Sequence, residues 1–283
     1  MTMPTLAIIG CGKVGKTLGR CWTANGAVSI TDIVNRSIDS ARDAAAFIGA
    51  GRALDDIAAL QPADIYLIGT GDDALASAGA LLAASGRVPR GAVVFHCSGL
   101  LGASVLQPLQ AQGAAVASIH PIRSFADPGK AAAEFAGTFC GAEGDPAALA
   151  ALEPLFEAIG GRLVPIDARN KRIYHAAAVF ASNYLVTLLD VARNAYIEAG
   201  IAPDLALQLL APLVRNTVDN VMRLGPAKAL TGPIARGDLA AAVDQLQAVT
   251  TWNADSGELY RQLARSTAAL AGQPQQVFDR KED

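Results

Sequence analysis

Residues 5–25 read TLAIIGCGKVGKTLGRCWTAN, and this stretch decides the fold. The apolar run Thr5–Ile9 predicts a strand, and Lys16–Asn25 predicts a helix. Gly10–Gly15 lies between them and has the form GxGxxG, a pattern that binds a dinucleotide when it joins a strand to a helix. Its three glycines permit a tight turn, close approach of a pyrophosphate, and close packing of helix on strand. The stretch therefore predicts the first β-α unit of a Rossmann domain.

The following part of the chain repeats this alternation of apolar runs and helical patterns. Further strands are predicted at residues 28–34, 65–68, 92–96, 115–119, 137–140 and 162–166, with helices at 39–48, 74–84, 104–112 and 146–158. Strands this apolar are typical of a parallel sheet covered on both faces. After residue 167 only helices are predicted, at 170–199, 204–224, 239–249 and 256–270. We therefore expect an α/β fold, with an N-terminal Rossmann dinucleotide-binding domain over residues 1–167 and an all-helical C-terminal domain over residues 168–283.

Composition narrows the possible classes of function. The 283 residues are 52% hydrophobic and 17% charged, which excludes a disordered protein. Gly91–Ile122 and Ile173–Leu189 lack charged residues, but polar residues or glycines interrupt both, so we predict no membrane span. A net charge of −3 without a basic cluster argues against nucleic acid as a partner. Four cysteines without metal-ligand spacing predict no metal site and reduced thiols in a cytoplasmic protein.

The choice of cofactor depends on the residues at the end of the second predicted strand. Asp32 fits the position of the acid that binds the ribose 2′-OH in NAD enzymes. If the strand continues through Val34, it ends at Asn35-Arg36-Ser37, and an arginine there can pair with the 2′-phosphate of NADP. We favour NADP and keep NAD as the alternative. With the small residues that end later strands included, the predicted cofactor-binding residues are Gly10, Cys11, Gly12, Lys13, Val14, Gly15, Asn35, Arg36, Ser37, Thr70, Ser98 and Gly99.

Segments over nearly the whole chain resemble a bacterial family of Rossmann-like NADP oxidoreductases with a C-terminal domain of unknown function, number 2520. The matching segments are Gly10–Gly15, Asn35–Ser37, Cys97–Gly99, His120–Phe125, Tyr174–Asn183 and Leu230–Asp238. More distantly, the chain is similar to pyrroline-5-carboxylate reductase, ketopantoate reductase and the β-hydroxyacid dehydrogenases, in which a helical, often dimerising domain follows the Rossmann domain. The resemblance implies NADP and a reductase, although a fold alone does not establish a reaction.

Hydride transfer to a carbonyl or imine requires a proton donor beside the substrate. On the first helix after the predicted boundary, Lys171 and His175 share a face, and Asn183 lies at its edge. The resemblance to β-hydroxyacid dehydrogenases implies Lys171 as the acid or base and Asn183 as a ligand of substrate or nicotinamide. The second residue of their Lys-x-x-x-Asn pattern is here His175. His120, which follows the fifth predicted strand, is a further candidate donor, and Arg123 can bind a substrate carboxylate.

Other interpretations of these residues stay open. Lys171 lies in a basic run and can be a solvated helix start, His175 can be a core imidazole, and His120 can belong to a turn. Two classes of function therefore remain. The first is an NADP(H)-dependent oxidoreductase that transfers a hydride to or from a small carbonyl, imine or hydroxy or amino acid-like substrate in the interdomain cleft. The second is a non-catalytic NADP-binding redox sensor or regulatory protein. The apolar C-terminal helices predict a homodimer.

Overall fold

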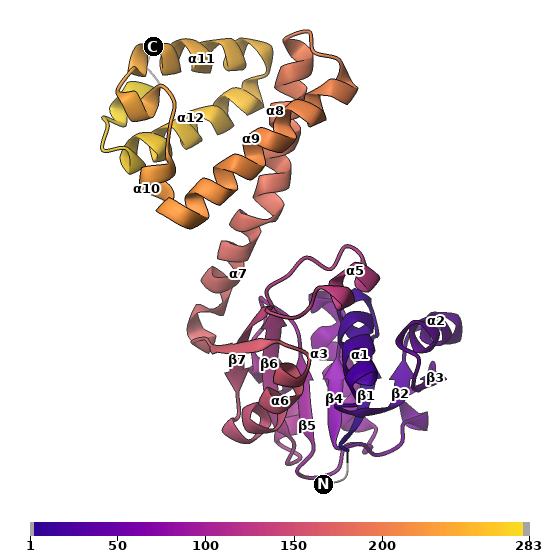
Figure 1. The fold of residues 1–283 in the computed structure, drawn as a ribbon. Coiled ribbons are helices and arrows are strands. Elements are labelled where there is room, and N and C mark those ends of the chain that lie inside the picture. The colour runs from indigo at the N-terminus through magenta and orange to yellow at the C-terminus, as the bar shows by residue number, and fades with distance from the viewer. Residues whose placement is uncertain (1–2, 280–283) are drawn as a thin grey trace. The chain divides into compact units, whose positions relative to one another are not determined.

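The computed structural model describes residues 3–279 and divides after Ser182 into two compact units (Figure 1). The division falls later than the predicted boundary at residue 167. Helix α7 (Lys171–Ala181) stays with the first unit because its side chains bond to the sheet. Lys171 pairs with Glu143, and Tyr174 is hydrogen-bonded to His120.

The first unit is built on one eight-stranded sheet in the order β3-β2-β1-β4-β5-β6-β7-β8. All neighbours from β3 to β6 pair in parallel, which confirms the predicted Rossmann arrangement. The strands are β1 (Thr5–Ile9), β2 (Ser29–Val34), β3 (Arg52–Leu54), β4 (Ile65–Ile68), β5 (Val93–His96), β6 (Ala115–Pro121), β7 (Phe139–Gly144) and β8 (Arg162–Pro165).

Two features of the sheet differ from the prediction. Strand β3 was missed because it has only three residues, too few to show a periodic pattern. The sheet is also not parallel throughout, since β7 pairs antiparallel to β6. The connection between them contains only the short helix α5 (Pro128–Ala133), which rises about 9 Å and is shorter than either strand. The chain turns back beside β6 instead of crossing over to begin a parallel strand.

Helices cover both faces of this sheet and give it two apolar cores. Alternate residues of β1 point to opposite faces of the sheet. Leu6 and Ile8 therefore belong to one core, and Ala7 and Ile9 belong to the other. The helices of the first core are α1 (Lys13–Asn25), α2 (Ile38–Ile48) and α6 (Pro146–Ala158), and those of the second are α3 (Asp72–Ala84) and α4 (Gln107–Gln110). The uncharged stretch Gly91–Ile122 thus includes the buried strands β5 and β6.

The second unit is helical throughout the part that the structure describes, as predicted. Its helices are α8 (Asn183–Glu198), α9 (Pro203–Leu224), α10 (Pro226–Ala229), α11 (Leu239–Trp252) and α12 (Ala254–Leu270). Helices α11 and α12 pack around Ala242, Leu246, Ala264 and Ala268. The single helix predicted over residues 170–199 is instead two, α7 and α8. Ser182 separates them with φ −122° and ψ −70°, and serine readily satisfies the backbone outside a helix.

The stretch that contains α7 and α8 is unusually apolar. Ala168–Glu198 is long and apolar enough to cross a membrane, with a mean hydropathy of 1.3, judged by length and composition alone. Its most apolar window is not buried. Ile173, Phe180 and Val186 are 69%, 68% and 68% exposed. These side chains leave apolar surface exposed in the described part of the chain.

Candidate active site

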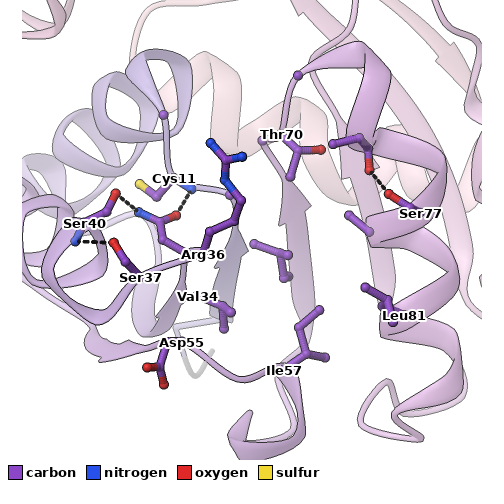
Figure 2. Close-up of a pocket in the computed structure, with 18 of the residues that line it drawn as sticks. Cys11, Val34, Arg36, Ser37, Ser40, Asp55, Ile57, Thr70, Ser77 and Leu81 are labelled. Atoms are coloured by element: carbon purple, nitrogen blue, oxygen red, sulfur yellow. Dashed lines mark hydrogen bonds between the residues drawn. The ribbon is translucent and has the colours of Figure 1, made fainter.

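A cavity of about 640 Å³ opens at the carboxyl ends of β1, β2 and β4 (Figure 2). This edge is where open α/β sheets bind their ligands. The predicted residues Gly10, Cys11, Gly12, Asn35, Arg36, Ser37 and Thr70 all line it, together with Ile9, Val34, Ser40, Asp55, Ile57, Gly69, Gly71, Asp73, Ala74, Ser77, Ala78 and Leu81. The cavity thus brings together residues from three strand ends, the predicted fingerprint among them.

The fingerprint glycines shape the floor of this cavity. Gly10 has φ +77°, and a Cβ there would overlap the methyl group of Thr70 and lie 2.9 Å from its backbone nitrogen. At Gly12 a Cβ would meet only the carbonyl oxygen of Gly69, at 3.9 Å, so the backbone is open on the cavity side. Gly12 is also the N-cap of α1 and makes no side-chain hydrogen bond. The first amides of α1 therefore remain available to a phosphate, and the helix dipole favours its charge.

The loop after β2 forms the side of the cavity where a ribose phosphate would lie. Asn35 Oδ1 accepts a hydrogen bond from the Cys11 amide at 2.6 Å, and its Nδ2 donates to Ser40 Oγ at 2.9 Å. This amide ties the fingerprint loop to the start of α2. Arg36 extends between the segments that carry Cys11 and Thr70 (Figure 2) and is exposed. The hydroxyls of Ser37 and Ser40 lie on the same rim.

Asp32, the alternative ligand for a ribose hydroxyl, is engaged elsewhere. Its carboxylate accepts hydrogen bonds from Arg52 at 2.9 and 3.3 Å and from the Gln61 amide at 2.7 Å. The residue is 1% exposed and does not line the cavity. The sequence spacing that suggested an NAD-binding acid therefore marks a structural carboxylate.

Thr70 carries a polar atom that suits a bound ligand. Its Oγ1 is buried and has no hydrogen-bond partner within the described residues, although it borders the cavity. A buried hydroxyl without a partner is costly unless something binds it. The glycine-lined floor, the free helix amides and this hydroxyl together fit a nicotinamide dinucleotide, whose phosphates and ribose hydroxyls supply the missing partners.

A second group of polar side chains lies at the ends of β5 and β6. The rings of His120 and His175 are 5.7 Å apart at 78°, and those of His120 and Tyr174 are 5.6 Å apart at 86°. Gly99 adjoins them, because a Cβ there would overlap Nδ1 of His175. Two of the predicted catalytic residues, His120 and His175, therefore meet beside the predicted Gly99.

Lys171 lies in a buried network next to this group. Its ammonium contacts Ser118 Oγ and lies 3.0 Å from Glu143 Oε1, and the two charged side chains are only 2% and 9% exposed. Ser118 Oγ is in turn 3.4 Å from Nδ1 of His96. The solvated helix start that was one interpretation of Lys171 is therefore wrong. A second cavity of about 470 Å³ reaches Lys171 and Glu143 from the side of Leu100, Leu101 and Arg172.

Burial shifts the protonation of these groups. It lowers the pKa of His96 to about 3, and the nearby Lys171 charge adds to this. Burial also lowers the pKa of His120 to about 4, with His175 and Lys171 contributing. For Lys171 burial lowers the pKa, while Glu143 acts in the opposite direction. His96 and His120 are consequently neutral at pH 7.

The other predicted residues take varied positions. Ser98 Oγ accepts hydrogen bonds from the Leu100 and Leu101 amides, so it stabilises a turn, and like Gly99, Lys13, Val14 and Gly15 it does not line the main cavity. Arg123 pairs with Glu134 at 2.7 Å. Asn183 begins α8 and is the first residue of the second unit.

Sequence reasoning missed Ser40, Ser118 and Glu143. Ser40 follows the predicted strand end closely enough that its helix-start position was a usable signal. Ser118 and Glu143 meet Lys171 across separations of 53 and 28 residues, and no local pattern marks such contacts.

Comparisons with known proteins agree with this architecture. A Rossmann-like domain matches residues 3–121, and the domain of unknown function DUF2520 matches residues 138–267. The chain combines a Rossmann-like domain with a DUF2520 domain. This confirms the resemblance drawn from the sequence motifs. No curated protein matches the chain significantly.

Solved structures share this arrangement over nearly their whole length. Protein TM1727 from Thermotoga maritima is 27% identical, with 94% of this chain and 98% of that chain covered and a TM-score of 0.74. BF3122 from Bacteroides fragilis, named a "putative NADP oxidoreductase", is 21% identical over 94% and 98%, with a TM-score of 0.76. Pyrroline carboxylate reductase from Plasmodium falciparum, solved with NADP bound, is 12% identical over 96% and 99%, with a TM-score of 0.61. The chain thus shares its fold, over both domains, with these solved structures.

Proposed function

We propose that this protein is an NADP(H)-dependent oxidoreductase that transfers a hydride to or from a small carbonyl or imine compound. The observation that carries the proposal is the cavity lined by Gly10, Gly12 and Thr70. Gly12 is the N-cap of α1, and the buried Thr70 hydroxyl has no hydrogen-bond partner within the described residues. These groups suit the pyrophosphate and ribose of a dinucleotide. The reductases of the same fold, two of them named for NADP or solved with it, support the same class of reaction.

The end of β2 favours NADP over NAD. An NAD site needs a carboxylate for the ribose 2′-OH, and Asp32 is already bonded to Arg52 and the Gln61 amide. Arg36, Ser37 and Ser40 provide a guanidinium and two hydroxyls on the rim, a donor set that suits a 2′-phosphate. Binding of the 2′-phosphate would therefore distinguish the two cofactors by a charge-assisted contact.

The proposed substrate side is the group formed by His120 and His175. Both lie near strand ends that continue the cavity edge, and both carry ring nitrogens that can bind a substrate oxygen or nitrogen. Lys171 would act on this group through Ser118 and its charge, because its ammonium already contacts Ser118 and Glu143. A role for Asn183 as a ligand of substrate or nicotinamide stays a proposal that rests on the family resemblance.

Turnover tests this function directly. The purified protein is mixed with NADPH and a panel of aldehydes, 2-oxo acids and cyclic imines, and oxidation of the cofactor is followed by absorbance. We expect at least one compound to be reduced, with activity lost in His120→Gln and cofactor affinity kept. Tight NADPH binding with no turnover on the panel would favour the competing function, a redox sensor or regulatory protein. That alternative is motivated by the engagement of Lys171 with Glu143.

We further propose a homodimer formed through the C-terminal helices. Leu205, Leu209 and Leu213 on α9 are 47%, 40% and 56% exposed, and their spacing of four residues places them on one face of the helix. Met222 on the same helix is 81% exposed. A second copy with the same face would bury this surface. Light scattering at micromolar concentration should give twice the mass of one chain, and a monomer mass would refute the dimer.

We place the protein in the cytoplasm. Cys11, Cys21, Cys97 and Cys140 are all free thiols, the state that a reducing compartment maintains. The apolar stretch Ala168–Glu198 is assigned to the dimer contact instead of a membrane. Recovery of the expressed protein in the soluble fraction without detergent checks this assignment, whereas recovery only from membranes would contradict it.

A further inference from the structure

The side chains of His120 and Tyr174 meet where β6 and β7 pair. His120 on β6 is the register partner of Gly141 on β7. Gly141 leaves room for an incoming ring, because a Cβ there would overlap the phenol oxygen of Tyr174 and lie 2.6 Å from Cζ. Tyr174 from α7 fills this room, and its oxygen lies 2.9 Å from Nδ1 of His120. The antiparallel pairing thus positions a tyrosine against one nitrogen of the histidine ring.

The opposite side of the His120 ring faces a different neighbour. Nε2 and Cε1 of His120 both lie 2.9 Å from the point that a Cβ of Gly99 would occupy, and Nδ1 of His175 overlaps that point. Nδ1 of His175 is buried without a hydrogen-bond partner in the described part of the chain. Two ring nitrogens therefore lie against Gly99, in the place that a side chain at this position would occupy. Such a pair suits the oxygen or nitrogen of a reacting carbonyl or imine.

We propose that His120 and Tyr174 form a proton relay, with His120 facing the reacting group beside Gly99 and Tyr174 replacing the proton from the other side of the ring. The proposal rests on the proposed oxidoreductase function and adds the path of the proton to it. His120 is the catalytic residue of the pair, since it faces the substrate, and Tyr174 is a positioning residue that acts through His120.

The relay balances in protons and electrons. A dinucleotide, when bound, would supply the hydride, which brings two electrons to the substrate carbon, and the π electrons of the C=O or C=N bond would move to the heteroatom. That heteroatom takes the proton from Nε2 of His120. Nδ1 of His120 then takes the phenol proton of Tyr174. After the product leaves, water returns a proton to Nε2, and Nδ1 gives its proton back to the tyrosine oxygen. The ring passes between its two neutral tautomers, and oxidation of the reduced compound runs through the same steps in reverse.

The surroundings suit a relay that never requires a charged ring at rest. Burial lowers the pKa of His120 to about 4, so the imidazole is neutral at pH 7. Burial raises the pKa of Tyr174, so its phenol is protonated at rest. A hydrogen bond from the Gly141 backbone acts in the opposite direction and stabilises the phenolate when the proton leaves. The resting pair thus holds the two protons that the relay needs.

Histidine NMR tests the relay without a known substrate. The full chain contains three histidines, so protein labelled with ¹³C and ¹⁵N in histidine gives three imidazole signal sets, assigned with single His→Gln variants. Ring nitrogen shifts report the tautomer. We expect His120 to carry its proton on Nε2 at pH 7 in the wild type. Tyr174→Phe should convert this signal to a tautomer mixture, and Tyr260→Phe, the same change in the second unit, should leave it unchanged.

Two results would overturn the relay: a wild-type His120 protonated on Nδ1, or no response of its tautomer to Tyr174→Phe. NADPH titrations of the same samples separate the relay from the wider proposal. Tyr174→Phe should bind NADPH as tightly as the wild type. A wild type that fails to bind NADPH contradicts the oxidoreductase function, and the tautomer still decides the relay. On any compound that is reduced, Tyr174→Phe should lower kcat at least tenfold with KM for NADPH unchanged, and an unchanged kcat would refute the relay.

Discussion

The carboxylate of Asp32 is held by the guanidinium of Arg52, with hydrogen bonds of 2.9 and 3.3 Å between neighbouring strands. Asp32 is 1% exposed, and the Gln61 amide takes a further lone pair of the same carboxylate. The one acid at the spacing of an NAD-binding carboxylate is therefore not directed to the cofactor. Arg36, in the turn that follows β2, extends over the cavity instead (Figure 2). The proposed preference for NADP rests on an arginine, and not an acid, lining the cavity at this strand end.

The first prediction concerns Gly10 in the fingerprint. Gly10→Ala should reduce the free energy of unfolding by roughly 2–4 kcal/mol, because the new Cβ overlaps Thr70 and φ is positive. Gly26→Ala is the control, since Gly26 has φ +68° but nothing within 4 Å of the new Cβ. That variant should lose only about 1 kcal/mol. Urea unfolding measures both, and equal losses would show that Thr70 does not restrict residue 10.

The second prediction concerns the buried pair of Lys171 and Glu143. Lys171→Met should cost roughly 3–5 kcal/mol of unfolding free energy, because it leaves the Glu143 charge buried without its partner. The double variant Lys171→Met with Glu143→Gln should recover most of this loss. Denaturant unfolding of the single and double variants gives the coupling between the two residues. Losses that simply add would contradict a direct ion pair.

The third prediction is a pH dependence of stability. His96 and His120 have pKa values lowered to about 3 and about 4, below the ordinary 6.5 of the unfolded chain. Between these values the unfolded chain binds protons that the folded chain does not. The free energy of unfolding should therefore keep the full contribution of these two histidines above about pH 6.5. It should fall by on the order of 3 kcal/mol as the pH decreases to about 5.

His120→Gln separates the contribution of this residue to the pH dependence. Its unfolding free energy, measured in urea at each pH, should decrease less steeply than that of the wild type between about pH 7 and about pH 5. His96 then accounts for most of the remaining slope. Identical slopes in the variant and the wild type would mean that His120 titrates equally in the folded and unfolded chain.

Much of the fold followed from local sequence patterns. Gly10–Gly15 between an apolar run and a helix defined the first unit, and the sheet order from β3 to β6 is the one that such a domain adopts. The prediction failed where contacts between residues far apart in the sequence determine the structure. The antiparallel pairing of β7 with β6 is made between residues such as Ala117 and Gly144, and the break at Ser182 interrupts a continuous apolar pattern. Neither has a periodic signal in the sequence.

The residues of the candidate site also fall into those that local sequence patterns predict and those that they do not. Arg36 and Thr70 could be named from strand ends, because position along a strand determines which edge of the sheet a residue occupies. The role of Asp32 could not, since its partner Arg52 lies on a three-residue strand that shows no pattern. Tyr174 stood in the predicted helix, but its contact with His120 depends on the glycine opposite, at position 141.

Calorimetric titration of NADPH and NADH into the wild type and Arg36→Ala tests the proposed NADP(H) site most directly. We expect the wild type to bind NADPH more tightly than NADH. Arg36→Ala should weaken NADPH binding roughly 10- to 100-fold and leave NADH unchanged, because only NADPH loses a charge-assisted contact worth about 1.5–3 kcal/mol. Arg42→Ala, on the exposed surface of α2, should change neither affinity. Equal and weak binding of both cofactors by the wild type would contradict the account.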